Sequence, residues 1–343
     1  HCISWQRQMC IRDSNQPEVD DPTMKTLRLM DYDMFVPGNH EFNYGMTILQ
    51  RQLDYLTSEA TETEDSVAVG CANYLDADTN SDESIDWNTW NDYAPYQLYD
   101  FDGVTVAVMG IGNPNIPKWD VPANWEGIHF ANVIETYKHY EQELTEKADL
   151  IVLASHSGID SDSESDFIRR LISETNTIDL VFSGHEHRNG VTMIANTDGQ
   201  EIPVLSPSTK AAVVSQAVVT YDKLTGEYAI DAGNVAMTTR EGGQQKPLYE
   251  VDPDLEAALK PYETATWQDY MLQPIGKATG DFSAANLGTA PSAFVDLVNK
   301  VQIWGAYDRT GENTPDDESD DTPAQLSITA PLTSGNAENL IPE

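Results

Sequence analysis

The sequence predicts an α/β fold in which two sheets pack together with helices outside them. From residue 15 to about residue 245, apolar runs typical of strands alternate with segments whose apolar residues recur at helical spacing. The later strands follow one another directly and alternate in polarity, which is typical of antiparallel pairs. Three of the earlier runs end at histidine motifs, and ligands of α/β proteins bind beyond the carboxyl ends of such strands.

The expected elements can be placed along the chain. Segments with strand character are 33–37, 104–110, 150–154, 178–182, 202–205, 212–221 and 227–237. Helical spacing predicts helices over 45–56, 131–147 and 163–174. The last of these begins with acidic residues, which the helix dipole favours at that end. The alternation of these elements supports the α/β prediction.

The composition excludes some functions. A net charge of −38 over 343 residues leaves no basic patch for a nucleic-acid polymer. We interpret the acidity as a solvated surface suited to salty water, because at about 1 M salt the Debye length is only about 3 Å. The alternative is calcium binding, but the acidic clusters at 76–86, 160–166 and 316–321 lack the spacing of a calcium loop. No apolar stretch approaches the roughly 18–20 residues of a membrane span.

The first 14 residues differ from the rest of the chain. They contain Cys2 and Cys10, no acidic residue before Asp13 and no initiator methionine or signal-peptide core. We expect residues 1–14 to be a non-native, adapter-derived segment, the alternative being an unusual N-terminal arm. On this interpretation the natural start is missing and the lack of an export signal carries no meaning. The remaining cysteine, Cys71, is expected to be a small buried apolar residue.

The C-terminal part has a different pattern. Residues 241–247 break the alternation, and 252–272 predict an amphipathic linker helix interrupted at Pro261. One further helix is expected at 290–301. Because about 70 residues rarely form an independent core, we expect 273–343 to be the start of a truncated second domain. The predicted divisions are 1–14, 15–245, 246–272 and 273–343.

Three motifs carry the chemistry. They are Gly38-Asn39-His40-Glu41, Ser155-His156-Ser157-Gly158 and Ser183-Gly184-His185-Glu186-His187. Imidazole nitrogen and amide oxygen bind divalent metals such as zinc, manganese or iron. His185 and His187 stand two apart and can reach adjacent metals, and we expect Gly38 and Gly184 to permit the necessary turns. Each motif alone has a common structural explanation, but together, each at a strand end, they favour a metal centre.

These motifs resemble a known family. Residues 33–45 (DMFVPGNHEFNYG), 154–158 and 183–187 resemble the calcineurin-like metallophosphoesterases. The resemblance covers roughly residues 24–343 and is strongest to exported 5′-nucleotidases and 2′,3′-cyclic-nucleotide 2′-phosphodiesterase/3′-nucleotidases. It implies a four-layer αββα sandwich domain, followed by a linker helix and a truncated α/β nucleotide-binding domain.

The resemblance also implies roles for individual residues. Asn39, His156 and His185 would bind one divalent metal ion and His187 a second, with zinc, manganese, iron and cobalt all possible. A hydroxide held between the two metals would attack phosphorus. His40 would stabilise the transition state or protonate the leaving oxygen, as an imidazole can near neutral pH.

Two departures from the family pattern stand out. Asn43 occupies a position where 5′-nucleotidases usually carry Asp, so a neutral amide would orient His40; a purely structural role in the turn is an equal alternative. The family's Asp-x-His and Gly-Asp-x-x-Asp motifs are absent from residues 1–37. Without a bridging carboxylate two close cations repel, so we expect this chain to be an inactive fragment of an enzyme. A non-catalytic metal-binding scaffold is the alternative of another class.

The C-terminal segments 290–302 and 326–332 resemble the cyclic-nucleotide branch, as does Asn43. The implied substrate is a small nucleotide, with a 5′-nucleotidase or another phosphomonoesterase as the alternative. The resemblance implies a periplasmic or extracellular location. Trp119, Trp125 and Trp304 could stack on a base, but we expect them to serve packing.

Overall fold

The computed structural model describes residues 21–62, 64–77, 85–159, 167–241, 244–274, 277, 282–283, 292–307 and 340–341. The chain forms two compact units, His1–Met271 and Leu272–Glu343, which are described separately. The predictions for 1–14, 160–166, 316–321 and 326–332 lie outside the described residues. The finer divisions at residues 245 and 272 stay predictions.

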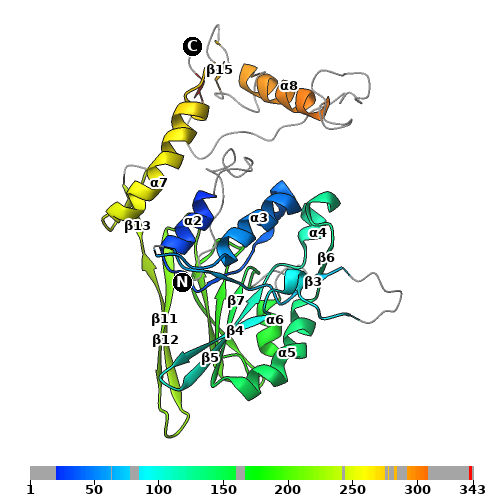
Figure 1. The fold of residues 1–343 in the computed structure, drawn as a ribbon, viewed down its shortest axis with the longest axis vertical. Helices are drawn as coiled ribbons and strands as arrows, with labels where there is room; N and C mark the ends of the chain where they lie inside the picture. The colour runs from blue at the N-terminus through cyan, green and yellow to red at the C-terminus, as the bar shows by residue number, and fades with distance from the viewer. Residues whose placement is uncertain are drawn as a thin grey trace. The chain divides into compact units, whose positions relative to one another are not determined.

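A six-stranded mixed sheet is the centre of the first unit (Figure 1). In spatial order its strands are β4 (Tyr96–Phe101), β5 (Val104–Ile111), β7 (Leu150–Ser155), β8 (Leu180–Ser183), β10 (Glu201–Pro207) and β9 (Asn189–Ala195). The four inner strands run parallel, and β4 and β9 pair antiparallel at the edges. The predicted α/β class with a central sheet is confirmed. The four-layer sandwich stays a prediction.

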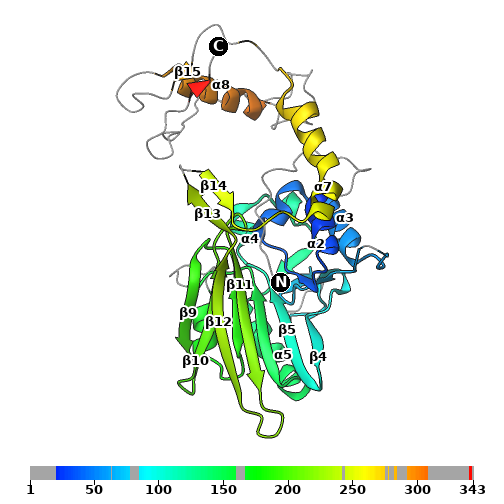
Figure 2. The same ribbon diagram turned by 90° about the vertical axis from the view of Figure 1, so that its left-hand side faces the viewer.

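Within the described part of this unit, four further strand pairs accompany this sheet. β1 (Met34–Phe35) runs parallel to β2 (Ala68–Val69), and β11 (Val213–Tyr221) forms an antiparallel hairpin with β12 (Tyr228–Ala236). The hairpin contacts β9 and β10, and Figure 2 shows it alongside them. Two small antiparallel pairs are β3 (Tyr74–Asp76) with β6 (Ile128–Phe130), and β13 (Thr238–Glu241) with β14 (Gln244–Pro247). The late antiparallel pairing expected from the sequence is therefore present.

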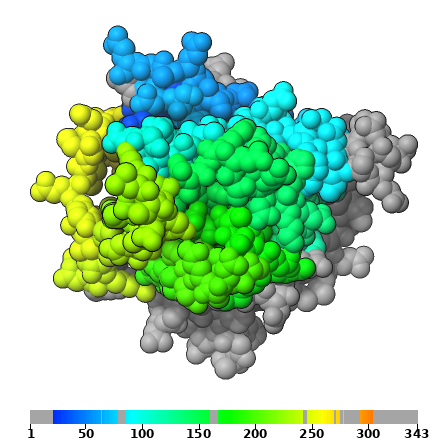
Figure 3. Space-filling model, turned by 90° about the horizontal axis from the view of Figure 1, so that it is seen from below, coloured from blue at the N-terminus to red at the C-terminus, as the bar shows by residue number. Residues whose placement is uncertain are grey.

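Three helices lie close to their predicted positions: α3 (Met46–Thr57), α5 (Val133–Lys147) and α6 (Ile168–Ser173). The helices α2 (Pro22–Leu29) and α4 (Ile116–Trp119) were not predicted. Asp21 and Asn132 begin α2 and α5, because their side chains accept hydrogen bonds from otherwise unpaired main-chain N–H groups. In Figure 1, α5 and α6 lie on the side of the sheet opposite the β11–β12 hairpin. Seen from below, the yellow-green part of the chain lies at the left and the green part lies beside it (Figure 3).

Two buried apolar clusters hold these layers together. One fills the space between the six-stranded sheet and α5 and α6, with Tyr137 and Leu171 among its members. The other joins α2 and α3 to the strands beside them and contains Leu49 and Leu53, which recur at the predicted helical spacing. Cys71 is fully buried in this second cluster, which confirms its expected apolar role.

The β1–β2 pair meets the central sheet main chain against main chain. A Cβ atom at Gly110, near the end of β5, would lie 2.5 Å from the carbonyl of Gly70, which follows β2. No side chain fits in that space, so glycine at both positions lets the two strand ends touch. This contact places the end of β1 close to the carboxyl ends of the central strands.

The linker helix corrects one prediction. Helix α7 (Pro253–Ala265) passes through Pro261 without interruption and continues as the π-helix η4 (Thr266–Met271). Proline lacks an N–H donor, but its fixed φ is compatible with a helix, so one lost hydrogen bond need not end it. Asp252 caps the first turn through Asp254 N and Leu255 N.

The described part of the second unit is small. It contains β15 (Phe282–Ser283), which pairs antiparallel with β16 (Leu340–Ile341), and α8 (Ala293–Tyr307). The helix expected at 290–301 is present and extends further toward the C-terminus. Among the described residues of both units, no helix combines the length and the apolar character needed to cross a lipid bilayer.

Candidate functional site

The three histidine motifs follow the carboxyl ends of β1, β7 and β8. Asn39 and His40 begin the 3₁₀ helix η1 (Asn39–Tyr44), which three residues separate from the end of β1. Ladder hydrogen bonds continue past the other two strands, from His156 N to Ile111 O (2.9 Å) and from Gly184 N to Ser155 O (2.8 Å). Because β7 and β8 are parallel and in register at Ser155 and Ser183, their motifs emerge side by side.

The structure brings the predicted metal ligands together. The Nε2 atom of His156 lies 3.1 Å from Asn39 Oδ1, and its ring meets the ring of His185 edge-on with centroids 5.4 Å apart. Burial, together with the nearby imidazoles of His185, His40 and His187 in that order of effect, lowers the pKa of His156 to about 3. His156 is therefore neutral at physiological pH, which is the form that binds metal.

The donor chemistry fits a divalent cation. Neutral imidazole nitrogens beside an amide oxygen suit zinc, manganese, iron or cobalt. Within the described stretches, however, no group of three or more His, Cys, Asp or Glu side chains is arranged to hold a metal. If the prediction holds, Asn39, His156 and His185 would provide only part of a ligand set. The assignment of His187 to a second cation stays a prediction.

Glycine is required at position 38 for a different reason from the expected one. Its φ of −93° is open to any residue, so the turn does not require glycine there. A Cβ atom at Gly38 would instead lie 2.8 Å from both Cε1 and Nε2 of His156 and 2.9 Å from Glu41 Oε2. The buried Glu41 carboxylate accepts a hydrogen bond from Gly38 N (2.7 Å), which fixes the turn. Glycine is needed for close approach to His156.

The turn after β8 also differs from expectation. Gly184 is not in the left-handed region; the histidines themselves are, with φ of 72° at His185 and 57° at His187. Such values are uncommon for residues with a side chain and cost free energy, although histidine tolerates them better than most. The unusual backbone therefore lies at the predicted ligands rather than at the glycine beside them.

His40 takes part in a hydrogen-bonded chain of three side chains. Its Nδ1 lies 2.8 Å from Asn43 Oδ1, and Asn43 Nδ2 donates to Asp120 Oδ2 at 2.9 Å. The contact between His40 and Asn43 is the one that the predicted orienting role requires, and the choice between this role and a purely structural one stays a prediction. Asp120 was not predicted, because it lies 77 residues further along the chain, in a segment without a recognisable motif.

The tryptophans behave differently from one another. Trp125 packs edge-on against Phe130, with centroids 5.9 Å apart, which confirms the packing prediction for that residue. Trp119 is 48% exposed and stacks on the ring of His185, with centroids 5.2 Å apart and planes 18° apart. It therefore covers a predicted ligand rather than filling a core. The side chain of Trp304 lies outside the described residues.

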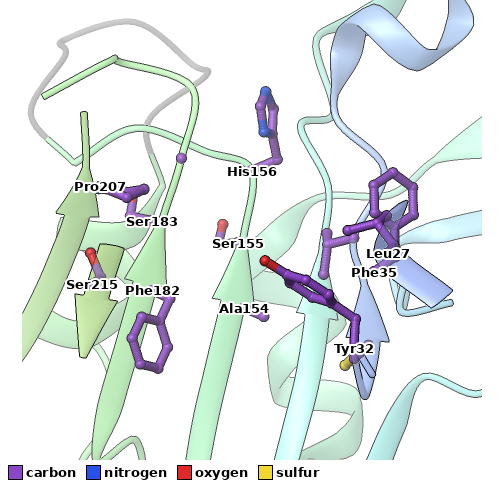
Figure 4. Close-up of a pocket in the computed structure, with 13 residues that line it drawn as sticks. Leu27, Tyr32, Phe35, Ala154, Ser155, His156, Phe182, Ser183, Pro207 and Ser215 are labelled. Carbon is purple, nitrogen blue, oxygen red and sulfur yellow. The ribbon is translucent and has the colours of Figure 1, made fainter. Parts of the chain in front are cut away.

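His156 is one of the residues that line a pocket at the ends of β1, β7 and β8 (Figure 4). It lies between β1, β7, β8, β11 and the end of α2, and its lining residues are Leu27, Tyr32, Met34, Phe35, Val36, Ala154, Ser155, His156, Phe182, Ser183, Gly184, Pro207 and Ser215. Apart from His156 the lining contains no ionisable group other than the Tyr32 phenol. An anionic phosphate therefore finds no cationic partner inside this pocket.

Residues 14–189 match the calcineurin-like phosphoesterase family. The matched range includes all three histidine motifs and more than half of the chain. The chain therefore belongs to this family, whose members hydrolyse phosphoester bonds.

Individual relatives narrow the comparison. The chain is 24% identical to a 2′,3′-cyclic-nucleotide 2′-phosphodiesterase/3′-nucleotidase of Haemophilus influenzae, over 82% of this chain and 44% of that protein. It is 26% identical to the protein of the same name from Salmonella typhimurium, again over 82% of this chain and 44% of the relative. The fold resembles the crystal structure of a 5′-nucleotidase precursor from Thermus thermophilus, with a TM-score of 0.60, 19% identity and coverage of 83% and 53%. The chain thus spans about half the length of these proteins.

Replacing Gly38 with alanine tests the close approach to His156. The added methyl group must push the turn and the imidazole apart, so Gly38→Ala should lower the free energy of unfolding by about 1–3 kcal/mol and weaken zinc binding. Urea unfolding and calorimetric titration with zinc measure the two effects. Gly233→Ala is the control, because no atom lies within 4 Å of a Cβ at Gly233. Equal behaviour of both variants would contradict the steric argument.

The lowered pKa of His156 predicts sensitivity to acid. Below pH 6.5 the unfolded chain binds a proton at this residue, whereas the folded chain binds it only near pH 3. The free energy of unfolding of the metal-free protein should therefore fall through this window as the pH falls. His156→Gln should flatten the fall, whereas His129→Gln, at an exposed position in β6, should not. Urea unfolding at stepped pH gives the comparison, and parallel curves for all three proteins would refute it.

Proposed function

We propose that this chain is part of a metal-dependent phosphoester hydrolase that acts on nucleotides, with 2′,3′-cyclic nucleotides and 3′-nucleotides as its substrates. The observation that carries the proposal is the meeting of Asn39, His156 and His185 at the ends of three strands, with His40 on the same turn as Asn39. Phosphoester hydrolysis needs donors that hold a metal ion and a group that transfers a proton. Neutral nitrogen and oxygen atoms supply the first, and the exposed imidazole of His40 supplies the second.

The proposed cofactors are two divalent cations. Asn39, His156 and His185 would hold one of them and His187 the other. A bound divalent cation supplies Lewis-acid polarisation of a phosphoryl oxygen and stabilises negative charge on it. This chemistry is consistent with the neutral state of His156, whose lone pair is free of a proton at physiological pH.

The remaining residues position groups and move protons. His40 is exposed and its Nδ1 bonds to Asn43, so its Nε2 is the ring atom that can give a proton to the leaving oxygen. Trp119 lies over His185 and keeps water from one face of that imidazole. Hydrolysis of a 3′-nucleotide by this arrangement consumes one water and releases nucleoside and phosphate.

The choice of substrate rests on Asn43 and on the relatives. Two relatives that match most of this chain are named for activity on 2′,3′-cyclic and 3′-nucleotides. A 5′-nucleotidase is the alternative within the same fold. By analogy with these proteins we propose that the enzyme works outside the cytoplasm, in the periplasm or beyond the cell.

An alternative of another class is a metal-binding scaffold without catalysis. It is favoured by one observation, the absence from the described residues of a complete His, Cys, Asp and Glu ligand cluster. On this alternative Asn39, His156 and His185 would bind a cation, but no phosphoester would be turned over.

The assay that decides uses the protein expressed from its complete reading frame and loaded with manganese or zinc. Phosphate release from 2′,3′-cyclic AMP and 3′-AMP should exceed release from 5′-AMP. His185→Ala should lower turnover by at least about 100-fold, since loss of a ligand costs more than loss of a supporting residue. His129→Ala, at an exposed histidine, should leave turnover unchanged. Preference for 5′-AMP would identify a 5′-nucleotidase, and no turnover of any substrate would identify the scaffold.

A further inference from the structure

We propose that Asp120 is a positioning residue for His40, acting through the side-chain amide of Asn43 to fix which ring nitrogen of His40 carries the proton. This inference rests on the proposed function, in which His40 assists the leaving oxygen. It assigns a role to a carboxylate in a segment where the sequence shows no motif.

The direction of each hydrogen bond follows from the chemistry of the last group in the chain. A carboxylate can only accept, so Asn43 must turn its NH₂ group toward Asp120 Oδ2, at 2.9 Å. The amide oxygen of Asn43 then faces His40 Nδ1 at 2.8 Å and can only accept. Nδ1 must therefore be the protonated nitrogen, which leaves Nε2 as the ring nitrogen available to the leaving oxygen in the proposed reaction.

Asp120 itself is firmly held. Its Oδ1 accepts hydrogen bonds from Val121 N (2.8 Å) and from Asn124 Nδ2 (2.7 Å), and its main-chain N bonds to Ile116 O (3.0 Å). Asn124 Nδ2 also lies 3.4 Å from the main-chain oxygen of Asn43. These hydrogen bonds hold the carboxylate in place independently of its bond to the Asn43 side chain.

This anchoring matters because the other two members of the chain are exposed. Water competes for the hydrogen bonds of His40 and Asn43, and a mobile amide would spend part of its time with its nitrogen toward the ring. A fixed acceptor at Asp120 removes that alternative. Its charge is separated from the imidazole by a whole amide, so its main effect is on orientation. Loss of Asp120 should therefore lower kcat more than it changes KM.

The variant Asp120→Asn reverses the direction of the hydrogen bonds from Asp120 to His40 without changing the shape of the side chain. Two donors face Oδ1, so the amide oxygen of the new side chain stays there and its NH₂ group faces Asn43. Asn43 must then flip, present its own NH₂ to His40 and force the proton of the neutral ring onto Nε2. We expect kcat for 3′-AMP to fall about tenfold, a part of what proton transfer contributes, with KM nearly unchanged.

A double variant tests the proposal by restoring the original direction of the hydrogen bond to His40. In Asn43→Asp with Asp120→Asn, the carboxylate at position 43 accepts from both His40 Nδ1 and the new amide at position 120. The Nδ1-protonated ring and most of kcat should return. Asp231→Asn is the control, since Asp231 is an exposed carboxylate of β12. Kinetics use the metal-loaded protein from the complete reading frame, and circular dichroism verifies the fold of each variant.

Long-range ¹H–¹⁵N NMR spectra of the 343-residue chain identify the protonated nitrogen of neutral His40 without any need for activity. The expected order is Nδ1 in the wild type, Nε2 in Asp120→Asn and Nδ1 again in the double variant. The proposal is overturned if Asp120→Asn keeps the proton on Nδ1, or if the double variant fails to restore it. If the complete protein hydrolyses no phosphoester, the proposed function fails, while these spectra still decide the role of Asp120.

Discussion

The arrangement of the site depends on the missing side chain at Gly38. Because no Cβ is present, the turn after β1 lies directly against the imidazole of His156, and Asn39 Oδ1 comes within 3.1 Å of its Nε2. Gly70 and Gly110 also lack a Cβ, and there the main chain after β2 lies directly against the main chain of β5. These two glycine contacts set the distance between β1 and the central sheet. The positions of His40 and Asn43 follow, since both residues belong to the turn that begins at Asn39.

The short helix α4 and the residues after it connect the two sides of this site. Trp119 ends the helix and lies on His185, which follows β8, while the next residue, Asp120, bonds to Asn43 in the turn after β1. A 2.7 Å hydrogen bond between the side chains of Asp120 and Asn124 holds this segment in a compact turn. A displacement of the segment would therefore disturb a predicted ligand and the orienting amide together. Neighbouring residues of one segment thus relate two motifs that stand far apart in the sequence.

Much of this arrangement could be predicted from the sequence, and the exceptions share a physical cause. Apolar runs that end in histidine motifs define strand ends, so the meeting of His156 with His185 follows from parallel pairing. The spacing of Leu49 and Leu53 likewise predicted a buried helix face. Asp120 could not be found, because a hydrogen bond between side chains 77 residues apart leaves no local pattern. The continuous helix through Pro261 and the purpose of Gly38 were also missed, because each depends on space that only the folded chain defines.

The left-handed backbone at His185 and His187 bears on how such a protein changes over generations. Glycine or asparagine would occupy these conformations with less strain than histidine, so a mutation that relieves the strain would also remove the proposed metal binding. Most proteins stand just above a stability threshold, and sites of function are where stability is readily regained once selection for activity ends. A descendant that kept this fold but lost its chemistry would accumulate glycine or asparagine at these two positions first. The pair would then distinguish a silent copy from a working one in any collection of related genes.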